Sequence, residues 1–553
     1  MSPSVSETSS SASRTFSETP SSETIERARA AASSDTSESM DSRSYGQKWH
    51  GPLLGLVATG SGLAAAELVV GVFEGTSSPV VPVGQVFIDW VPRPLKEWAI
   101  DTFGTNDKVV LVVGALVVLL GIGVGVGMLA MRGARPAAYA LTCVTGLLGS
   151  WAVLTRPEPT LTKLLPTIIG TAVSIAVIWY LAPRPAAAGS PGADPIGAQP
   201  MGVDRRRFVG GAVGIGSAAV LVGGIGRILQ RQSEVVGERE DLVLPEPDSR
   251  SSPLPADADL DVEGLDPFVT PNADFYRIDT ALVVPQVSKD SWSLKIGGMV
   301  DNPVELSFAD LLSRPHVERH ITLSCVSNPI GGDLIGNALW QGVLLKDVLD
   351  EAGVHPDATQ VVSRSIDGWT AGTPTEVIMD GRDAILAIAM NGEPLPARHG
   401  YPVRMVVPGL YGYVSATKWV TEIELTRWED YDAYWVPRGW SKEGPIKTMS
   451  RIDTDRPASA PGERVVAGIA WAIHRGVSRV QVRVDGGPWI EAELGGVPSN
   501  DTWAQWKATV GLEPGRHMVE SRAFDGDGVP QTEETAPVAP NGAQGYPRRW
   551  IDI

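Results

Sequence analysis

The chain has 553 residues but only two cysteines and seven histidines. It contains no Cys-x-x-Cys and no Cys-x-x-Cys-His motif, so neither a thioredoxin-like site nor an attached c-type haem is encoded. Few side chains remain that could hold a metal cluster. Basic residues are also in short supply, since 46 Lys and Arg stand against 64 Asp and Glu and give a formal net charge of -18. This balance argues against a nucleic-acid partner, because phosphate binding requires a basic face.

The two cysteines lie in different kinds of sequence. Cys143 falls in an apolar stretch, whereas Cys325 lies in the segment 320–332, HITLSCVSNPIGG. Everything after about residue 232 therefore carries one thiol and can form no internal disulfide. If that part is exported, a lone thiol is open to oxidation, which favours a reactive residue or a metal ligand. A small buried side chain on a strand is the alternative.

The first half of the chain predicts an all-α transmembrane bundle. Residues 1–48 are rich in Ser, Thr, Glu and Ala and predict a disordered tail. Within the transmembrane region 49–230, five apolar runs are near the length that a bilayer requires. They cover 52–73, 108–131, 136–155, 161–182 and 208–229, while 76–107 is expected on the membrane face and 183–203 is a Pro/Ala/Gly linker. Glu67 lies inside the first run, either in a functional role or neutral against a neighbouring helix.

The orientation of this bundle follows from arginines before its last run. The segment 204–210, DRRRFVG, resembles a twin-arginine export signal, with a simple positive-inside stop as the alternative. No Ala-x-Ala site follows before Gln230, so we expect no cleavage. With five spans and the N-terminus inside, both interpretations place the chain after about residue 230 outside the cell membrane.

The second half predicts two folded domains after an acidic, Pro-rich linker at 231–265. Residues 266–445 alternate strand and helix patterns, which indicates a mixed α+β domain. We expect a strand at 292–296, a capped helical turn at 307–312 and a helix at 344–353. Residues 456–553 indicate an immunoglobulin-like β-sandwich. There, 477–484 alternates with period two, 485–487 (DGG) predicts a hairpin turn, and Ala492 and Leu494 continue the pattern on the far strand.

Four blocks in residues 266–553 resemble the sulfite oxidase superfamily of molybdenum–molybdopterin enzymes. They follow the family's order over about half the chain, which makes the resemblance specific. The last block resembles the family's C-terminal dimerisation domain and implies a possible homodimer. The blocks are 272–277 (NADFYR); 322–325 (TLSC) with Asn328 and 340–342 (WQG); 391–396 (NGEPLP) with 399–404 (HGYPVR), Pro408, Gly409, Lys418 and Trp419; and 485–487 with Trp489.

The resemblance implies a set of site residues. Cys325 is the implied catalytic metal ligand, and a soft thiolate is the protein ligand that a dithiolene-bound molybdenum would take. Arg277 is implied to point at the substrate. Arg404 and Lys418 flank the Gly-rich turn 408–412 (PGLYG), which suits the cofactor's phosphate. Surface cations, a structural histidine and a turn-capping asparagine are the alternatives within the implied cofactor set, which is Tyr276, Arg277, Asn328, His399, Arg404, Gly412 and Lys418.

Departures from the family bear on substrate and electron transfer. Sulfite oxidases follow the cysteine motif with paired arginines, where this chain has Pro329 and Ile330, and a usual tyrosine is Ile388. A pocket with fewer cations binds an anion less well, so the resemblance supports the cofactor more than it supports sulfite as the substrate. Reduction of a sulfoxide or another oxide is the competing reaction. Tyr411 and Tyr413 either line the pocket or pack in the core.

The expected partners are a small-molecule substrate and a separate electron carrier. The apolar runs lack histidine, so no haem is predicted, and a cytochrome or a quinone-linked protein is the expected carrier. A non-catalytic membrane protein with a sandwich receptor or adhesion module is the alternative from another functional class. The matched third block argues against it, because an adhesion module needs no pair of cations around a Gly-rich turn.

Overall fold

The structure is a computed structural model, and it describes residues 49–73, 76–103, 107–156, 160–183, 205–232, 235–458 and 462–553. The tail predicted at 1–48 and nearly all of the linker predicted at 183–203 lie outside these residues. The chain forms two compact units. One takes in helical stretches up to Gly224, and the other holds Ile225–Ile553 together with Val69–Val113 and Leu148–Pro166.

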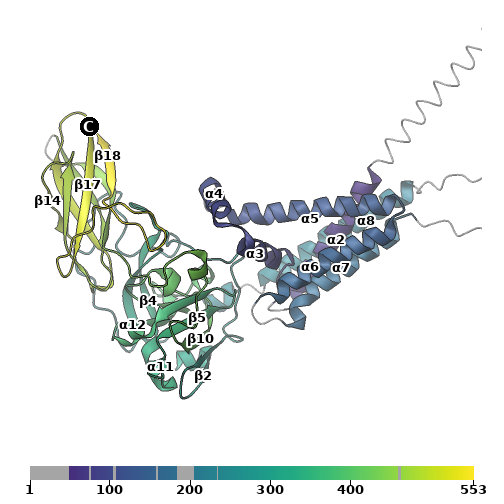
Figure 1. Ribbon diagram of the computed structural model, residues 1–553, viewed down its shortest axis with the longest axis horizontal. Helices are drawn as coiled ribbons and strands as arrows, with labels where there is room; N and C mark the ends of the chain where they lie inside the picture. Colours follow the sequence, from purple (N-terminus) through teal and green to yellow (C-terminus); the bar gives the residue numbers. More distant parts are fainter. Residues whose placement is uncertain are drawn as a thin grey trace, which may run out of the picture. The chain divides into compact units, whose positions relative to one another are not determined.

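Five helices are long and apolar enough to cross a membrane, by their length and composition. The predicted runs agree with the bounds of these helices to within three residues. Two shorter helices occupy the stretch expected on the membrane face, α3 (Val80–Trp90) and α4 (Arg93–Phe103). The long helices in Figure 1 are α2 (His50–Val72), α5 (Asp107–Met131), α6 (Arg135–Leu154), α7 (Leu161–Leu181) and α8 (Arg205–Gln232).

Glycines allow two of these helices to approach closely. A Cβ atom added to Gly55 of α2 would lie 1.9 Å from the carbonyl oxygen of Gly123 in α5, and one added to Gly127 would lie 2.1 Å from that of Gly51. Small residues spaced four apart on each helix permit this close contact between apolar helices. The positions of these glycines therefore determine which helices can pack closely, in addition to the length of each apolar helix.

The α+β domain contains two sheets, shown in teal and green in Figure 1. The first is mixed and has the order β2-β1-β10-β5-β6, with β1 and β10 parallel. The second has the order β3-β4-β7-β8, and β9 also pairs with β7. The bounds are β1 (Ser293–Gly298), β2 (Val304–Ser307), β3 (Val317–Ser324), β4 (Ile335–Leu344), β5 (Gln360–Ser365), β6 (Thr370–Pro374), β7 (Ile385–Met390), β8 (Glu393–Pro394), β9 (Arg404–Val406) and β10 (Val420–Thr426).

Local signals in the sequence account for the short helices of this domain. Ser307 and Asp310 form a reciprocal capping box at the start of α10 (Phe308–Leu312). Helix α11 (Leu345–Ala352) ends at Gly353, which has a φ of 69°. A third helix is α12 (Thr375–Met379), and 3-10 turns are η2 (Ala397–His399), η3 (Gly412–Val414) and η4 (Val436–Arg438).

The C-terminal part forms two four-stranded sheets. One has the order β11-β12-β16-β15 and the other β14-β13-β17-β18. The predicted strand at 477–484 is β13, but Leu494 does not continue its partner strand. Leu494 pairs with Trp506 in the other sheet, because the chain crosses between sheets after Glu491. The bounds are β11 (Met449–Pro457), β12 (Glu463–Trp471), β13 (Val477–Val484), β14 (Ile490–Glu491), β15 (Glu493–Leu494), β16 (Ala504–Gly511), β17 (Arg516–Asp525) and β18 (Arg548–Asp552).

The stretch predicted as a linker packs against the folded part from residue 235 onward. It contains α9 (Val236–Glu240). Ala258 lies in the same hydrophobic cluster as Trp471 and Trp503, and the Leu260 N–H donates to Gln505 Oε1 at 2.6 Å. Composition indicated a tether because the segment is acidic and rich in proline. Its few apolar side chains nevertheless pack against the hydrophobic cluster, and its backbone groups form hydrogen bonds with neighbouring strands.

Candidate functional site

Cys325 lies directly after β3, in the turn that leads to β4. Its backbone N–H donates to Leu334 O at 2.9 Å, and its carbonyl accepts from Asn328 N at 3.0 Å. The side chain is buried. Burial raises the pKa of the Cys325 thiol, while hydrogen bonds from Ser327 act in the opposite direction. The isolated protein therefore holds a protonated thiol, and a bound cation would be needed to make it a thiolate.

Two buried cations lie on segments far from Cys325 in sequence. Arg404 starts β9, where its Nη1 donates to His399 O at 3.1 Å and its guanidinium lies 4.8 Å from the Trp340 ring centroid. Its Nε is buried and has no hydrogen-bond partner. Burial lowers the pKa of Arg404 to about 10. A buried guanidinium that leaves a donor unused indicates a place for an anion.

Lys418 is the second buried cation, and it precedes β10. Its Nζ donates to Asp279 Oδ2 at 3.0 Å and to Arg398 O at 3.3 Å. Burial, and then the nearby Arg404, lower the pKa of Lys418 to about 8, although Asp279 acts against this shift. A lysine with such a pKa responds strongly to any further negative charge placed beside it.

Asp279 is a buried carboxylate that holds more than one cation. Arg277 Nε donates to it at 2.8 Å and Lys108 Nζ at 2.7 Å, in addition to Lys418. Burial alone would raise the pKa of Asp279, but Lys418, Arg277 and Lys108 together hold that pKa well below its usual range. Asp279 therefore stays ionised and offsets part of the local positive charge.

One cavity brings most of these groups together. Of the residues expected from the sequence, Tyr276, Cys325, Arg404, Gly412 and Lys418 line it. Its volume is about 130 Å³. The remaining lining residues are mostly aromatic, apolar or acidic: Phe275, Ile278, Asp279, Thr280, Val326, Ser327, Ser365, Asp367, Trp369, Tyr413, Ala416, Trp419, Trp435 and Trp440.

Three expected residues do not line this cavity. Arg277 is turned to Asp279 and its side chain is 34% exposed. The side-chain oxygen of Asn328 accepts from Leu334 N at 3.0 Å, so it holds the turn around Cys325. His399 is fully buried, and its carbonyl accepts the bond from Arg404. Burial, then Lys418 and Arg404, lower the pKa of His399 to about 3, so the ring is neutral.

Sequence patterns missed several lining groups. Asp279 is two residues from Arg277, a spacing that places both side chains on one side of an extended segment, and this signal was available. Ser327, two residues after Cys325, was equally close to a recognised motif. Tyr413 lines the cavity and also belongs to the main hydrophobic cluster, while its hydroxyl donates to Ser441 O at 2.7 Å. Tyr411 is buried and is not a lining residue.

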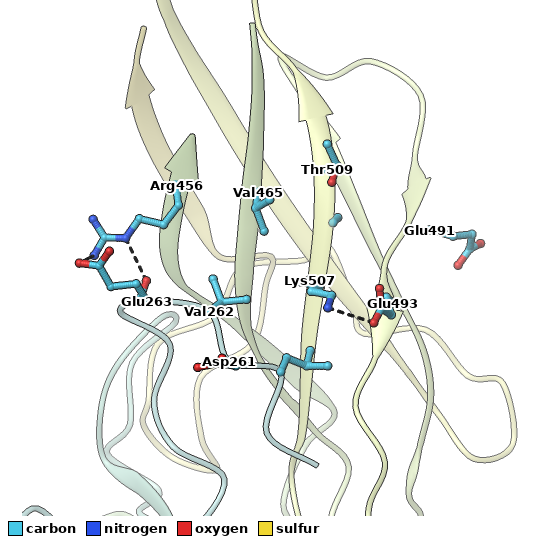
Figure 2. Close-up of a pocket in the computed structure, with 11 residues that line it drawn as sticks. Asp261, Val262, Glu263, Arg456, Val465, Glu491, Glu493, Lys507 and Thr509 are labelled. Atoms are coloured by element: carbon cyan, nitrogen blue, oxygen red, sulfur yellow. Dashed lines mark hydrogen bonds and ion pairs between the residues drawn. The ribbon is translucent and has the colours of Figure 1, made fainter. Parts of the chain in front are cut away.

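A second, larger cavity of about 520 Å³ lies beside the C-terminal sheets and has no such chemistry. Figure 2 shows that its charged side chains largely pair with one another. Arg456 contacts Glu263 at 3.4 Å, and Lys507 contacts Glu493 at 3.1 Å. Within the described residues there is also no group of three or more His, Cys, Asp and Glu that could hold a metal ion. Cys325 is the cysteine among the lining residues of the first cavity, and it is the candidate metal ligand there.

Comparisons with known proteins identify the family of the chain. Residues 281–435 match the family model described as the oxidoreductase molybdopterin binding domain. Sulfite oxidase from Gallus gallus is 32% identical over 322 residues, which cover 49% of this chain and 70% of that protein. The uncharacterized oxidoreductase YuiH of Bacillus subtilis (strain 168) is 37% identical over 164 residues, which cover 30% of this chain and 79% of YuiH.

The solved structures include the sulfane dehydrogenase SoxCD from Paracoccus pantotrophus. It is 26% identical, and the match covers 53% of this chain and 82% of that one with a TM-score of 0.46.

Proposed function

Since the chain belongs to the sulfite oxidase family and is a molybdopterin-dependent oxidoreductase, we propose that it transfers an oxygen atom to or from a small molecule. Electrons would be exchanged with a separate carrier protein. The observation that carries this proposal is the meeting of the Cys325 thiol with the buried cations Arg404 and Lys418 in one cavity.

The residues of this cavity fit molybdenum–molybdopterin. The cofactor needs a soft ligand for its metal and fixed cations for its phosphate. Cys325 offers the first, and Arg404, with its unpartnered Nε, and Lys418 offer the second. Gly412 lies across from the Tyr276 hydroxyl, and a Cβ there would come within 3.9 Å of that oxygen. His399 and Asn328 would act indirectly, by holding Arg404 and the Cys325 turn.

When bound, the cofactor supplies a metal that exchanges an oxygen atom and two electrons with a substrate. Cys325 would lose its proton on binding the metal. Arg404 and Lys418 would hold the phosphate and fix the orientation of the cofactor. Burial, and then the neighbouring Cys325, raise the pKa of Tyr276, so its hydroxyl keeps its proton and can donate a hydrogen bond in the cavity.

We propose that sulfite, named for the chicken relative, is a less favoured substrate of this chain. Arg277, the remaining candidate for an anion, is paired with Asp279 and is not a lining residue. The turn after Cys325 carries Pro329 and Ile330 rather than arginines, and Ile330 packs on the main hydrophobic cluster. Reduction of a sulfoxide or a related organic oxide therefore competes with oxidation of sulfite.

The wider assembly is also part of the proposal. The five long apolar helices support a multi-pass anchor in the cell membrane, and the arginines at the start of α8 support an outward-facing catalytic domain. We propose domain limits at 266–445 for the catalytic part and 456–553 for an immunoglobulin-like sandwich. The sandwich is the proposed homodimer contact, by analogy with the family.

Metal analysis of the two cysteine variants tests the proposal. Purified wild type and Cys143→Ser, whose cysteine is exposed in α6, should each contain about one molybdenum per chain. Cys325→Ser should lose turnover with both a reduced viologen and an oxidised acceptor, while its thermal unfolding stays close to wild type. Wild-type protein without molybdenum, or a turning-over Cys325→Ser variant, would contradict the assignment.

A further inference from the structure

Three tryptophans from two separate segments line part of the cavity that contains Cys325. Trp369 lies in the turn between β5 and β6, and Trp435 and Trp440 lie in the loop after β10. The ring centroids of Trp435 and Trp440 are 6.3 Å apart, and Tyr413 is 6.1 Å from Trp440. All three tryptophans are only partly buried. Aromatic rings thus form part of the wall of the cavity.

A carboxylate lines the same cavity. Asp367 Oδ1 accepts from the Trp369 backbone N–H at 3.1 Å, and Oδ2 accepts from Thr280 Oγ1 at 3.4 Å. Among the part of the chain that the structure describes, no ion pair involves Asp367. The Asp367 carboxylate therefore lines the cavity without an ion-pair partner among the described residues.

The basic side chains of this region have other partners. In the loop of Trp435 and Trp440, Arg438 Nη1 donates to Tyr434 O at 2.6 Å, and Lys442 Nζ donates to Tyr431 O at 2.7 Å. Neither lines the cavity. The two lining cations, Arg404 and Lys418, contact His399 and Asp279 instead. Across the described residues, no cation lies over the ring of Trp369, Trp435 or Trp440.

We infer that Trp369, Trp435, Trp440 and Asp367 form a subsite for an alkylated, positively charged group, such as a tertiary or quaternary ammonium. The negative face of an aromatic ring attracts such a cation, and a carboxylate adds to this attraction. An oxyanion would instead meet the like charge of Asp367. The inference rests on the proposed function, because it assigns the substrate of that same site a cationic end.

The turn that holds Asp367 has a second explanation. An Asp before Gly368, which has a φ of 91°, is common in a tight turn, where its carboxylate accepts backbone N–H bonds. Asparagine keeps that turn chemistry and removes the charge. Asp367→Asn therefore separates the two roles, because a turn residue would keep its function in this variant and a cation ligand would lose it.

Calorimetric titration of the full chain with choline and with 3,3-dimethyl-1-butanol, its uncharged isostere, tests the subsite. A maltoside detergent is required, since phosphocholine detergents carry the probe's own group. Wild type should bind choline about tenfold more tightly than the alcohol, in line with a partly desolvated cation–aromatic contact. Asp367→Asn should weaken choline about tenfold and leave the alcohol unchanged, while the exposed control Asp290→Asn changes neither.

Equal affinity of wild type for the two probes would overturn the inference, and this comparison needs no variant to fold. Unchanged choline affinity in a folded Asp367→Asn protein would overturn it as well. The molybdenum content of the same sample separates this test from that of the enzyme. Choline selectivity without molybdenum would support the subsite and contradict the proposed function, and molybdenum without selectivity would do the reverse.

Discussion

Replacing Asp279 by asparagine should destabilise the catalytic domain through the cation left behind. The Asp279 and Lys418 side chains are only 6% and 10% exposed, and their charged atoms are 3.0 Å apart. Removing one partner of a buried ion pair typically costs 3–5 kcal/mol, because the other charge stays desolvated. Two features place the expected loss near the lower end, at about 3 kcal/mol. Arg277 is partly exposed and can regain water, and Lys418 keeps its bond to Arg398 O.

The pKa of Lys418 limits the loss further. Asp279 raises the pKa of Lys418, which would otherwise be lower than about 8. In Asp279→Asn the ammonium can therefore shed its proton near neutral pH, which caps the penalty, since each pKa unit corresponds to about 1.4 kcal/mol. The fully deprotonated amine no longer attracts phosphate, so the variant should also retain less cofactor.

Thermal unfolding of the full chain measures the effect. A loss of about 3 kcal/mol corresponds to a decrease of roughly 6–12 °C in Tm for a domain of this size. The control Asp290→Asn removes an exposed partner of Lys289, with a side chain 81% exposed, and should change Tm little. The double variant Asp279→Asn/Lys418→Met should be more stable than Asp279→Asn alone, because no unpaired ammonium remains. An Asp279→Asn protein that melts together with the control would refute this reasoning.

Two further changes test the packing and the electrostatics of the fold. Gly342→Ala in β4 would place a Cβ 2.0 Å from Leu386 O, so the melting temperature of this variant should fall by the equivalent of about 1–3 kcal/mol. In the control Gly297→Ala in β1, the added Cβ meets nothing within 4 Å and causes no such clash. Equal melting temperatures of the two variants would contradict the argument. Burial alone would raise the pKa of Glu520, but Arg483 and Arg548 lower that pKa in the folded protein. The ionised Glu520 side chain therefore stabilises the fold above about pH 4.5, and this contribution is lost as the pH falls through the lowered pKa of the folded state. The Tm of wild type should therefore fall more steeply than that of Glu520→Gln on acidification below about pH 4.5, with exposed Glu534→Gln following wild type, and parallel curves would contradict the role of Glu520.

Local patterns in the sequence predicted those elements that neighbouring residues determine. The capping box of Ser307 and Asp310 and the glycine after α11 depend on residues a few positions apart, so α10 and α11 were within reach. The long helices were predicted because an uninterrupted run of about 20 apolar residues is typical of a membrane-spanning helix. The path after β14 was not predictable in this way. Whether Leu494 pairs with β13 or β16 depends on contacts with residues that are distant in sequence.

The site divides along the same line. The sequence predicted Cys325, Arg404 and Lys418 because they lie in blocks that resemble those of the family, and their meeting in one cavity is a property of the folded sheets. The loop with Trp435 and Trp440 matches no block, and its composition alone indicates only a surface loop. Asp367 in the β5–β6 turn likewise carries an ordinary turn signal. Only the fold brings these residues to the cavity wall.

The charged lining residues of the cavity and the turn after Cys325 both bear on which substrates the cavity can bind. Ile330 packs on the hydrophobic cluster, and its side chain lies 3.0 Å from where a Cβ on Gly545 would be, so this turn serves packing where sulfite oxidases are expected to present cations. The lining residues hold two basic side chains, Arg404 and Lys418, and two acidic ones, Asp279 and Asp367. If the phosphate of the cofactor takes the two cations, Asp279 keeps Arg277 and Lys108 as partners, and Asp367 is the acidic lining residue without an ion pair among the described residues. That balance, together with the aromatic walls, is what the proposed ammonium subsite requires.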